Sequence, residues 1–256
     1  MPRTPRTPTR RTAVLAAVAA TSLLATGAVL LGTNAEDPDA PRPVTTQEAE
    51  RLAVARFLAY ESSPARITAT IDDGADSVIV KGVIDYRTHR AVGTYTAGRP
   101  AQRGLIAWDT TGLSVSLHKP PADDTAAQVT RVAAQLPARA WTPRGYAQDP
   151  LDTALKVLMA LGVNRPDNPQ LLAQSGTRRL GERTLGGRSH TLFSGPRPQG
   201  RKAPQAATSP VTYWVDASGR LGRMELRTGG LPRPVLVDFL GTEPQVRIPD
   251  KPWRRR

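Results

Sequence analysis

Apolar and polar residues alternate along two long stretches of this chain, and the alternation predicts β-strands. Ile67, Ala69 and Ile71 are separated by polar neighbours, and residues 113–117 repeat the pattern after a turn. A period of two places apolar side chains on one face of an antiparallel sheet and polar side chains on the other. We therefore expect strands near residues 65–72, 77–86, 89–97, 104–109 and 113–118, and then near residues 178–184, 188–194, 211–216, 220–228 and 234–240.

Other stretches show helical spacing and helix-capping residues. Thr45 and Glu48 form a capping box, and apolar residues recur at helical spacing from there to about Tyr60. Gly162 stands where a left-handed cap would end a helix that begins with Asp-Pro. Two or three short helices are expected in the middle of the chain: one over residues 150–161, one over residues 169–176 and a third segment that opens at Asp123 or Asp124.

The order of these elements indicates the fold class. One helix precedes a run of strands, and short helices precede the second run. No strand alternates with a crossover helix, which argues against a doubly wound parallel sheet. We predict an α+β fold, a single curved antiparallel sheet that forms an unclosed half-barrel, with helices packed on its concave face. Helices or a ligand must cover the apolar concave face of such a sheet.

The first forty residues have the pattern of a targeting segment. Residues 1–11 contain four arginines and no acid, and residues 12–35 carry no charge. The 19 residues 13–31, most of them apolar, would form a helix of roughly 28 Å, close to the thickness of a bilayer core. We expect residues 12–32 to be a transmembrane anchor or, alternatively, a signal peptide cleaved near Ala35. The paired arginines at positions 10 and 11 also resemble a twin-arginine export signal.

The same pattern sets the expected domain organisation and location. Because the basic flank precedes the apolar run, the positive-inside rule places the tail 1–11 in the cytoplasm and the rest outside. We expect a linker at residues 33–43, one extracytoplasmic domain at residues 44–253 and a basic tail at residues 254–256. The protein would be a single-pass protein of the cell membrane, or secreted if the segment is cleaved.

Charge and composition narrow the possible partners. The 256 residues include 35 Lys and Arg against 22 Asp and Glu, a net charge of +13, and no cysteine. The absence of cysteine excludes disulfides, thiolate catalysis and Cys-ligated metals. The arginines are scattered with few aromatics beside them, so no nucleic acid is expected. The basic surface would instead attract anionic lipid head groups or cell-wall polymers.

Catalytic motifs are missing from the sequence. Residues 187–191 lack the second glycine of a nucleophile elbow, and no His-Glu-x-x-His or Walker A sequence occurs. His89, His118 and His190 fall on separate expected strands, where each is expected to be solvated. We therefore predict a protein that is not an enzyme and has no catalytic residue, no metal and no cofactor.

Two strand motifs near the C-terminus resemble a known family. Residues 213–226 read Tyr-Trp-Val-Asp-Ala-Ser-Gly-Arg-Leu-Gly-Arg-Met-Glu-Leu, and residues 235–241 read Val-Leu-Val-Asp-Phe-Leu-Gly. Both are similar to the closing strands of LolA/LppX/LprG-like envelope proteins of an actinobacterial type, and the resemblance extends in outline over residues 44–250. It implies an extracytoplasmic half-barrel that binds lipid acyl chains or lipopeptides, or that senses envelope stress. Without the lipobox cysteine of the lipoprotein members, the N-terminal helix would hold this chain at the membrane.

The expected ligand site is the apolar concave face of the half-barrel. Apolar residues at these periods would equally form a closed core, so both interpretations stand. The candidate ligand-binding residues are Trp108, Val115, Leu155, Leu158, Met159, Leu172 and Phe193.

Two functions are therefore expected. The first is an extracytoplasmic, membrane-tethered binding protein for a lipid or another hydrophobic ligand, held in the concavity of the half-barrel. The alternative is a non-catalytic envelope structural or stress-sensing protein that binds a protein partner through a closed half-barrel. An interior cavity of roughly 300–1,000 Å³ would favour the first.

Overall fold

The computed structural model of this protein describes residues 40–196 and 208–250. The expected tail 1–11, the expected anchor or signal segment 12–32 and the tail 254–256 lie outside the described residues. Among the helices of the described part, none combines the length and the apolar character needed to cross a membrane.

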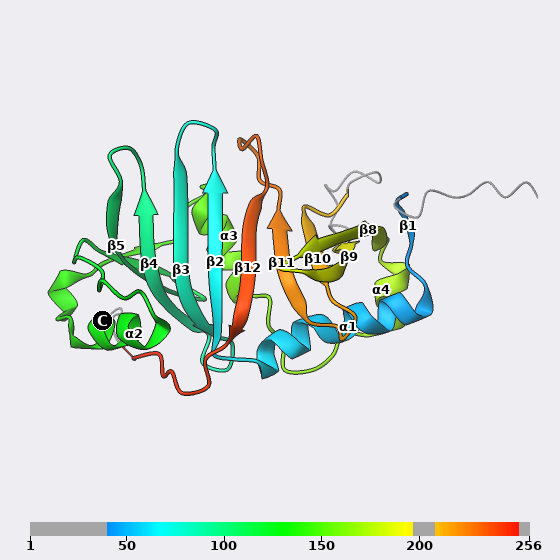
Figure 1. Ribbon diagram of the computed structural model, residues 1–256, viewed down its shortest axis with the longest axis horizontal. Helices are drawn as coiled ribbons and strands as arrows, with labels where there is room; N and C mark the ends of the chain where they lie inside the picture. Colours follow the sequence, from blue (N-terminus) through cyan, green and yellow to red (C-terminus); the bar gives the residue numbers. More distant parts are fainter. Residues whose placement is uncertain (1–39, 197–207, 251–256) are drawn as a thin grey trace, which may run out of the picture. The chain divides into compact units, whose positions relative to one another are not determined.

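One antiparallel sheet of twelve strands forms the framework of the described residues (Figure 1). The strand order is β1-β8-β9-β10-β11-β12-β2-β3-β4-β5-β6-β7, so that β12, the last strand in sequence, pairs with β2. β1 and β7 are the two edges, which confirms the prediction of a sheet that does not close. The strands are β1 (Arg42–Pro43), β2 (Ala65–Asp72), β3 (Ser77–Asp85), β4 (Arg90–Ala97), β5 (Gln102–Asp109), β6 (Gly112–Ser116), β7 (Thr142–Gly145), β8 (Arg178–Leu185), β9 (Arg188–Ser194), β10 (Val211–Val215), β11 (Leu221–Leu226) and β12 (Val235–Thr242).

The first helix begins at the predicted capping box. In α1 (Thr46–Glu61), the Thr45 hydroxyl accepts a hydrogen bond from the Glu48 amide at 3.3 Å, and the Glu48 carboxylate accepts one from the Thr45 amide at 2.8 Å. These two bonds satisfy amides that have no partner inside the helix. The other helices of the described residues are α2 (Ala126–Gln135), the 3₁₀ helix η1 (Ala138–Ala140), α3 (Pro150–Met159) and α4 (Pro169–Gln174).

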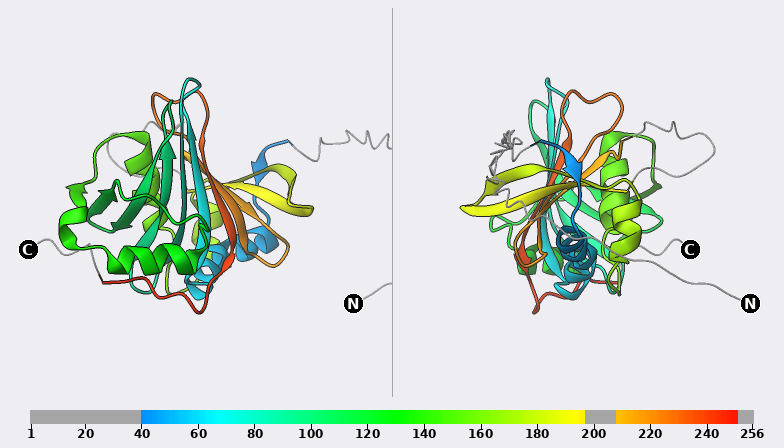
Figure 2. Two further views of the ribbon diagram at one scale, coloured as in Figure 1. Left: turned by 60° about the vertical axis from the view of Figure 1, so that its left-hand side comes forward. Right: turned by 90° about the vertical axis from the view of Figure 1, so that its right-hand side faces the viewer.

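The two faces of the sheet carry separate apolar cores. Ile84 belongs to a main core shared with α1, α3 and α4, whereas its neighbour Val83 belongs to a smaller core. Val129 and Ala133 of α2 join that smaller core and pack with Val92. The prediction that the helices gather on one face is therefore wrong for α2, because its apolar stripe covers the opposite face of β3 and β4. Figures 1 and 2 show α2 and α3 on opposite sides of the strands.

All ten predicted strands are present, with bounds that agree within two residues. The two edge strands were not predicted. β1 lies in the expected linker, where Pro43 pairs with Arg178, and β7 lies between two of the expected helices and pairs with β6. Gly162 is not a left-handed cap, because α3 ends earlier at the cap residue Ala160. Instead, a Cβ at Gly162 would lie 2.3 Å from Cγ of Tyr86, so only glycine allows this close approach.

The β8–β9 hairpin departs from the direction of the central strands. Figure 1 shows β8 and β9 running across the direction of β2, β3 and β4. The pairing register shifts between Arg179 and Gly181 in β8, between Trp214 and Val215 in β10, and after Phe239 in β12. Such bulges bend a strand and increase its local twist. Residues of this hairpin and of the end of β12 line a common groove.

Candidate functional site

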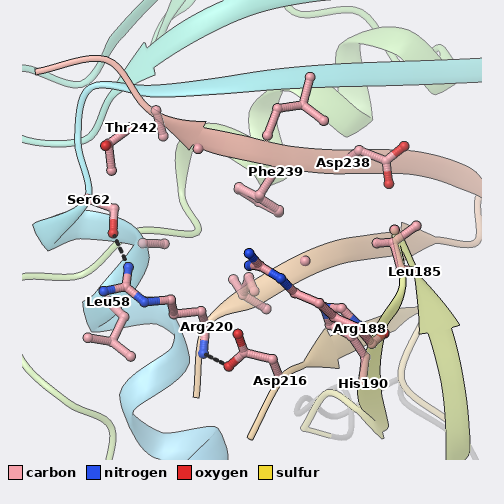
Figure 3. A pocket seen from close by; sticks show the side chains of 17 residues that line it. Leu58, Ser62, Leu185, Arg188, His190, Asp216, Arg220, Asp238, Phe239 and Thr242 are labelled. Carbon is pink, nitrogen blue, oxygen red and sulfur yellow. Dashed lines mark hydrogen bonds between the residues drawn. The ribbon is translucent and has the colours of Figure 1, made fainter. Parts of the chain in front are cut away.

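A groove lies where the β8–β9 hairpin, the β10–β11 hairpin and the end of β12 meet the C-terminal end of α1 (Figure 3). Its volume is about 520 Å³. That volume falls within the range of about 300–1,000 Å³ that is typical of small-molecule sites. The groove is therefore large enough to hold part of a lipid or a small organic ligand.

Apolar side chains from four elements form much of the groove wall. Leu58 comes from the last turns of α1, Leu221 from β11, and Phe239 and Leu240 from the end of β12, with Leu185 at the tip of the hairpin. Leu240 is 50% exposed, unlike most leucines of the domain. When a ligand covers an exposed apolar side chain and removes it from water, the free energy of the complex is lowered. The wall is thus suited to an apolar ligand.

Two arginines bring positive charge to the groove. The Arg220 guanidinium turns toward the end of α1, where Nη1 donates a hydrogen bond to Oγ of Ser62 at 3.3 Å. Arg188, at the start of β9, extends its guanidinium into the middle of the groove, toward Phe239 (Figure 3). Within residues 40–196 and 208–250, no hydrogen bond or ion pair engages that guanidinium. Arg188 therefore offers its donors to whatever enters the groove.

The two carboxylates that line the groove already have partners of their own. Asp238 accepts hydrogen bonds from Nε and Nη2 of Arg223, at 2.6 and 3.1 Å. Oδ1 of Asp216 accepts from the amide and hydroxyl of Ser218, at 2.9 and 2.7 Å, and from the Arg220 amide at 2.9 Å. Burial alone would raise the pKa of Asp216, but these hydrogen bonds and the nearby His190 lower it below its ordinary value. Both carboxylates are therefore engaged within the protein.

His190 has a defined position at the back of the groove. The prediction of a solvated histidine is wrong here, because His190 is only 5% exposed. Its Nδ1 lies 3.0 Å from the carbonyl oxygen of Arg188. A Cβ at Gly222 would come within 2.3 Å of Nε2, so the imidazole occupies space that only a glycine leaves open. The pair of Gly222 and His190 thus shapes this part of the groove.

A smaller hollow of about 210 Å³ lies beside α2. The ion pair between Lys81 and Asp124, at 3.0 Å, lies at this hollow, and Leu240 lines both the hollow and the groove.

The described part of the chain holds no group of three or more His, Asp or Glu side chains arranged to bind a metal ion.

The candidate residues identified from the sequence lie elsewhere, in and around the main core. Val115 is half-buried at its margin, and Leu172 also lines a small hollow of about 70 Å³ next to Arg56 and Tyr213. None of the seven lines the groove. The structure therefore brings them together as packed side chains, and their role in binding a ligand stays a prediction. The five that are at most 1% exposed are Trp108, Leu155, Leu158, Met159 and Phe193.

The sequence pattern does not reveal the groove, because its residues come from segments that only the fold brings together. Leu58 and Phe239 are far apart in the chain, and each fits the apolar stripe of its own element. One local signal was available. Gly186 and Gly187, both with positive φ (56° and 77°), form a tight turn directly before Arg188. Such a turn fixes where the first side chain of the following strand points.

Comparisons with known proteins give distant structural similarity only. No protein-family model and no curated protein matches the chain. An uncharacterized conserved protein from Thermus thermophilus is similar over 80% of this chain and 94% of its own, with 12% identity and a TM-score of 0.35. MucB is similar over 78% of this chain and 61% of its own, with 14% identity and a TM-score of 0.31. At these values neither structure assigns a function, and the family that the sequence resembles stays a prediction.

Proposed function

We propose that this protein is a non-catalytic binding module that holds a lipid or another apolar small molecule in the groove between α1, the β8–β9 hairpin and β12. The observation that carries the proposal is the groove itself, with its volume of about 520 Å³ and its exposed apolar wall at Leu240. A concave site with an apolar wall and a few polar groups is the usual form of a small-molecule site. The ligand would thus lie outside the half-barrel core and not within it.

The location of this module is part of the same proposal and rests on the sequence. Residues 12–32 would hold the domain at the outer face of the cytoplasmic membrane, or direct its secretion. A tethered domain stays next to a supply of lipids, so that even a site of modest affinity is occupied. The basic surface of the chain would add attraction to anionic head groups.

Mass spectrometry of the full chain, purified from its host, tests the proposal. We expect a bound lipid in native spectra, which solvent extraction then identifies. Leu240→Glu places a charge on the apolar wall and should remove the bound lipid. Leu117→Glu is the matched control, because Leu117 is 80% exposed and lies outside the groove. A wild-type chain with no bound lipid and no uptake of a fluorescent fatty acid would contradict the proposal.

A protein partner is the second candidate function. The observation that favours it is the packing of the main core, where the side chains of Trp108, Leu155 and Leu158 are fully buried. A half-barrel filled in this way presents surfaces rather than an interior. A photo-crosslinking amino acid at position 240 separates the two functions, because it would capture a lipid in the first case and a protein in the second.

A further inference from the structure

We infer that the groove selects amphiphiles with one anionic head group, a carboxylate or a phosphate, and that Arg188 binds this head group. The inference rests on the proposed function and adds the chemical class of the ligand and the residue that recognises it. It comes from the charged side chains of the groove, whereas the proposed function depends on the apolar wall.

Arg188 has the position and the chemistry for this role. The two-glycine turn at Gly186 and Gly187 ends directly before it, and its guanidinium lies inside the groove near Phe239 (Figure 3). A guanidinium presents a planar set of donors that matches both carboxylate and phosphate in a bidentate geometry. Arg188 is exposed to solvent, so a head group that enters the groove can reach these donors.

The carboxylates of the groove do not satisfy Arg188. Asp238 is held by two hydrogen bonds from Arg223, and Oδ1 of Asp216 is held by the turn that it caps. Of the two arginines that line the groove, Arg220 donates a hydrogen bond to Ser62, whereas Arg188 has no hydrogen bond or ion pair among the described residues. An anion is therefore the ligand that Arg188 can bind.

The groove offers apolar side chains to the rest of the ligand. Phe239 lies near the guanidinium of Arg188 (Figure 3), and Leu240, the next residue of β12, also lines the groove. Leu240 lines the hollow beside α2 as well. The arrangement of a cation at one end and apolar side chains beyond it is that of an amphiphile site.

Binding measurements on the full chain with four probes test the inference. The probes are dodecanoate, dodecyl phosphate, the neutral dodecanol and inorganic phosphate. We expect both anionic amphiphiles to bind at least about tenfold more tightly than dodecanol. Arg188→Gln should abolish this preference by weakening the binding of both anionic probes, and Arg188→Lys should keep part of it. Arg103→Gln is the matched control, because it removes an exposed strand arginine that lies outside the groove.

The outcomes separate the inference from the proposed function. Equal affinity for dodecanol and dodecanoate, or a preference that survives Arg188→Gln, overturns the inference and leaves the apolar groove in place. Binding of inorganic phosphate as tightly as dodecyl phosphate shows an anion site without an amphiphile and also overturns it. If no amphiphile binds at all, the proposed function itself is wrong. A preference for only one of the two anionic probes would identify the head group as carboxylate or phosphate and supports the inference.

Discussion

The fully buried carboxylate of Asp152 accepts hydrogen bonds from both terminal nitrogens of Arg144. Nη2 of Arg144 lies 2.8 Å from Oδ1, and the Ala147 amide donates to Oδ2 at 2.6 Å. The hydrogen bonds to Asp152 raise the pKa of Arg144 above its ordinary value, although burial opposes this shift. Arg144 belongs to β7 and Asp152 to α3, a helix whose apolar side chains are part of the main core. The ion pair therefore connects the edge strand of the sheet to that core.

We expect Arg144→Ala to lower the free energy of unfolding by about 2–4 kcal/mol. The variant leaves the buried Asp152 carboxylate with fewer donors, and an undercompensated buried charge is costly. Urea denaturation of wild type and variant measures the difference. Arg139→Ala, at an exposed arginine of η1, should change stability by less than about 0.5 kcal/mol. A loss no larger than that of the control would show that the Ala147 amide alone stabilises Asp152.

The stability of the domain should depend on the ionisation of Glu48. This carboxylate is buried and accepts hydrogen bonds from both terminal nitrogens of Arg42, at 2.8 and 2.7 Å, and lies 3.5 Å from Nε of Arg179. Burial acts to raise the pKa of Glu48, but the interactions with Arg42 and Thr45 outweigh it and lower the pKa below its ordinary value. The unfolded chain therefore holds this proton more tightly than the folded one.

The sign of the pH effect follows from that difference. The stabilisation from Glu48 is present above the unfolded pKa of about 4.3 and is lost as the pH falls through the lower folded pKa. We expect Glu48→Gln to be less stable than wild type at neutral pH, and the difference to narrow below about pH 4. Urea denaturation across this pH range measures it. A difference that is constant with pH would mean that the charge of Glu48 contributes nothing.

The strand pattern could be predicted from the sequence because it depends on local alternation. Ile67 and Ala69 show the period of a half-buried strand without any knowledge of the partner strand. β7 could not be predicted in this way, because Pro143 and the exposed residues around it show no apolar alternation. What holds β7 in the sheet is its pairing with β6 and the contact of Arg144 with a helix that follows later.

The position of α2 and the groove depend on contacts between distant segments. The spacing of Val129 and Ala133 shows that one side of α2 is apolar, but not which face of the sheet receives it. Likewise, nothing near Arg188 in sequence shows that Phe239 will lie beside it. The predicted site residues were chosen because they are apolar, and apolar residues also form the core of the domain. The candidates therefore lie in and around that core.

The contact between Gly222 and His190 predicts a coupled pair of substitutions. Gly222→Ala should lower stability by about 1–3 kcal/mol, because the new methyl group would overlap the imidazole. His190→Ala in the same chain should relieve that cost, which a double-mutant cycle measures. Gly229→Ala is the matched control, since a Cβ there has no neighbour within 4 Å. Additive effects of the two substitutions would contradict the predicted overlap.

The main core offers the last test, because a packed core and a ligand cavity respond differently to a larger side chain. Leu158 of α3 is fully buried in the main core. If the space around it is filled, Leu158→Trp lowers the free energy of unfolding by about 1–3 kcal/mol or more, with no effect on a ligand in the groove. If the half-barrel instead held a ligand next to Leu158, the indole ring of the new tryptophan would occupy the space of that ligand. The variant would then lose little stability, and the bound lipid would be absent from its native mass spectrum. Leu171→Trp, at an exposed leucine of α4, is the control for introducing an indole. We expect the first outcome, with bound lipid retained, because Leu158 is fully buried and does not line the groove.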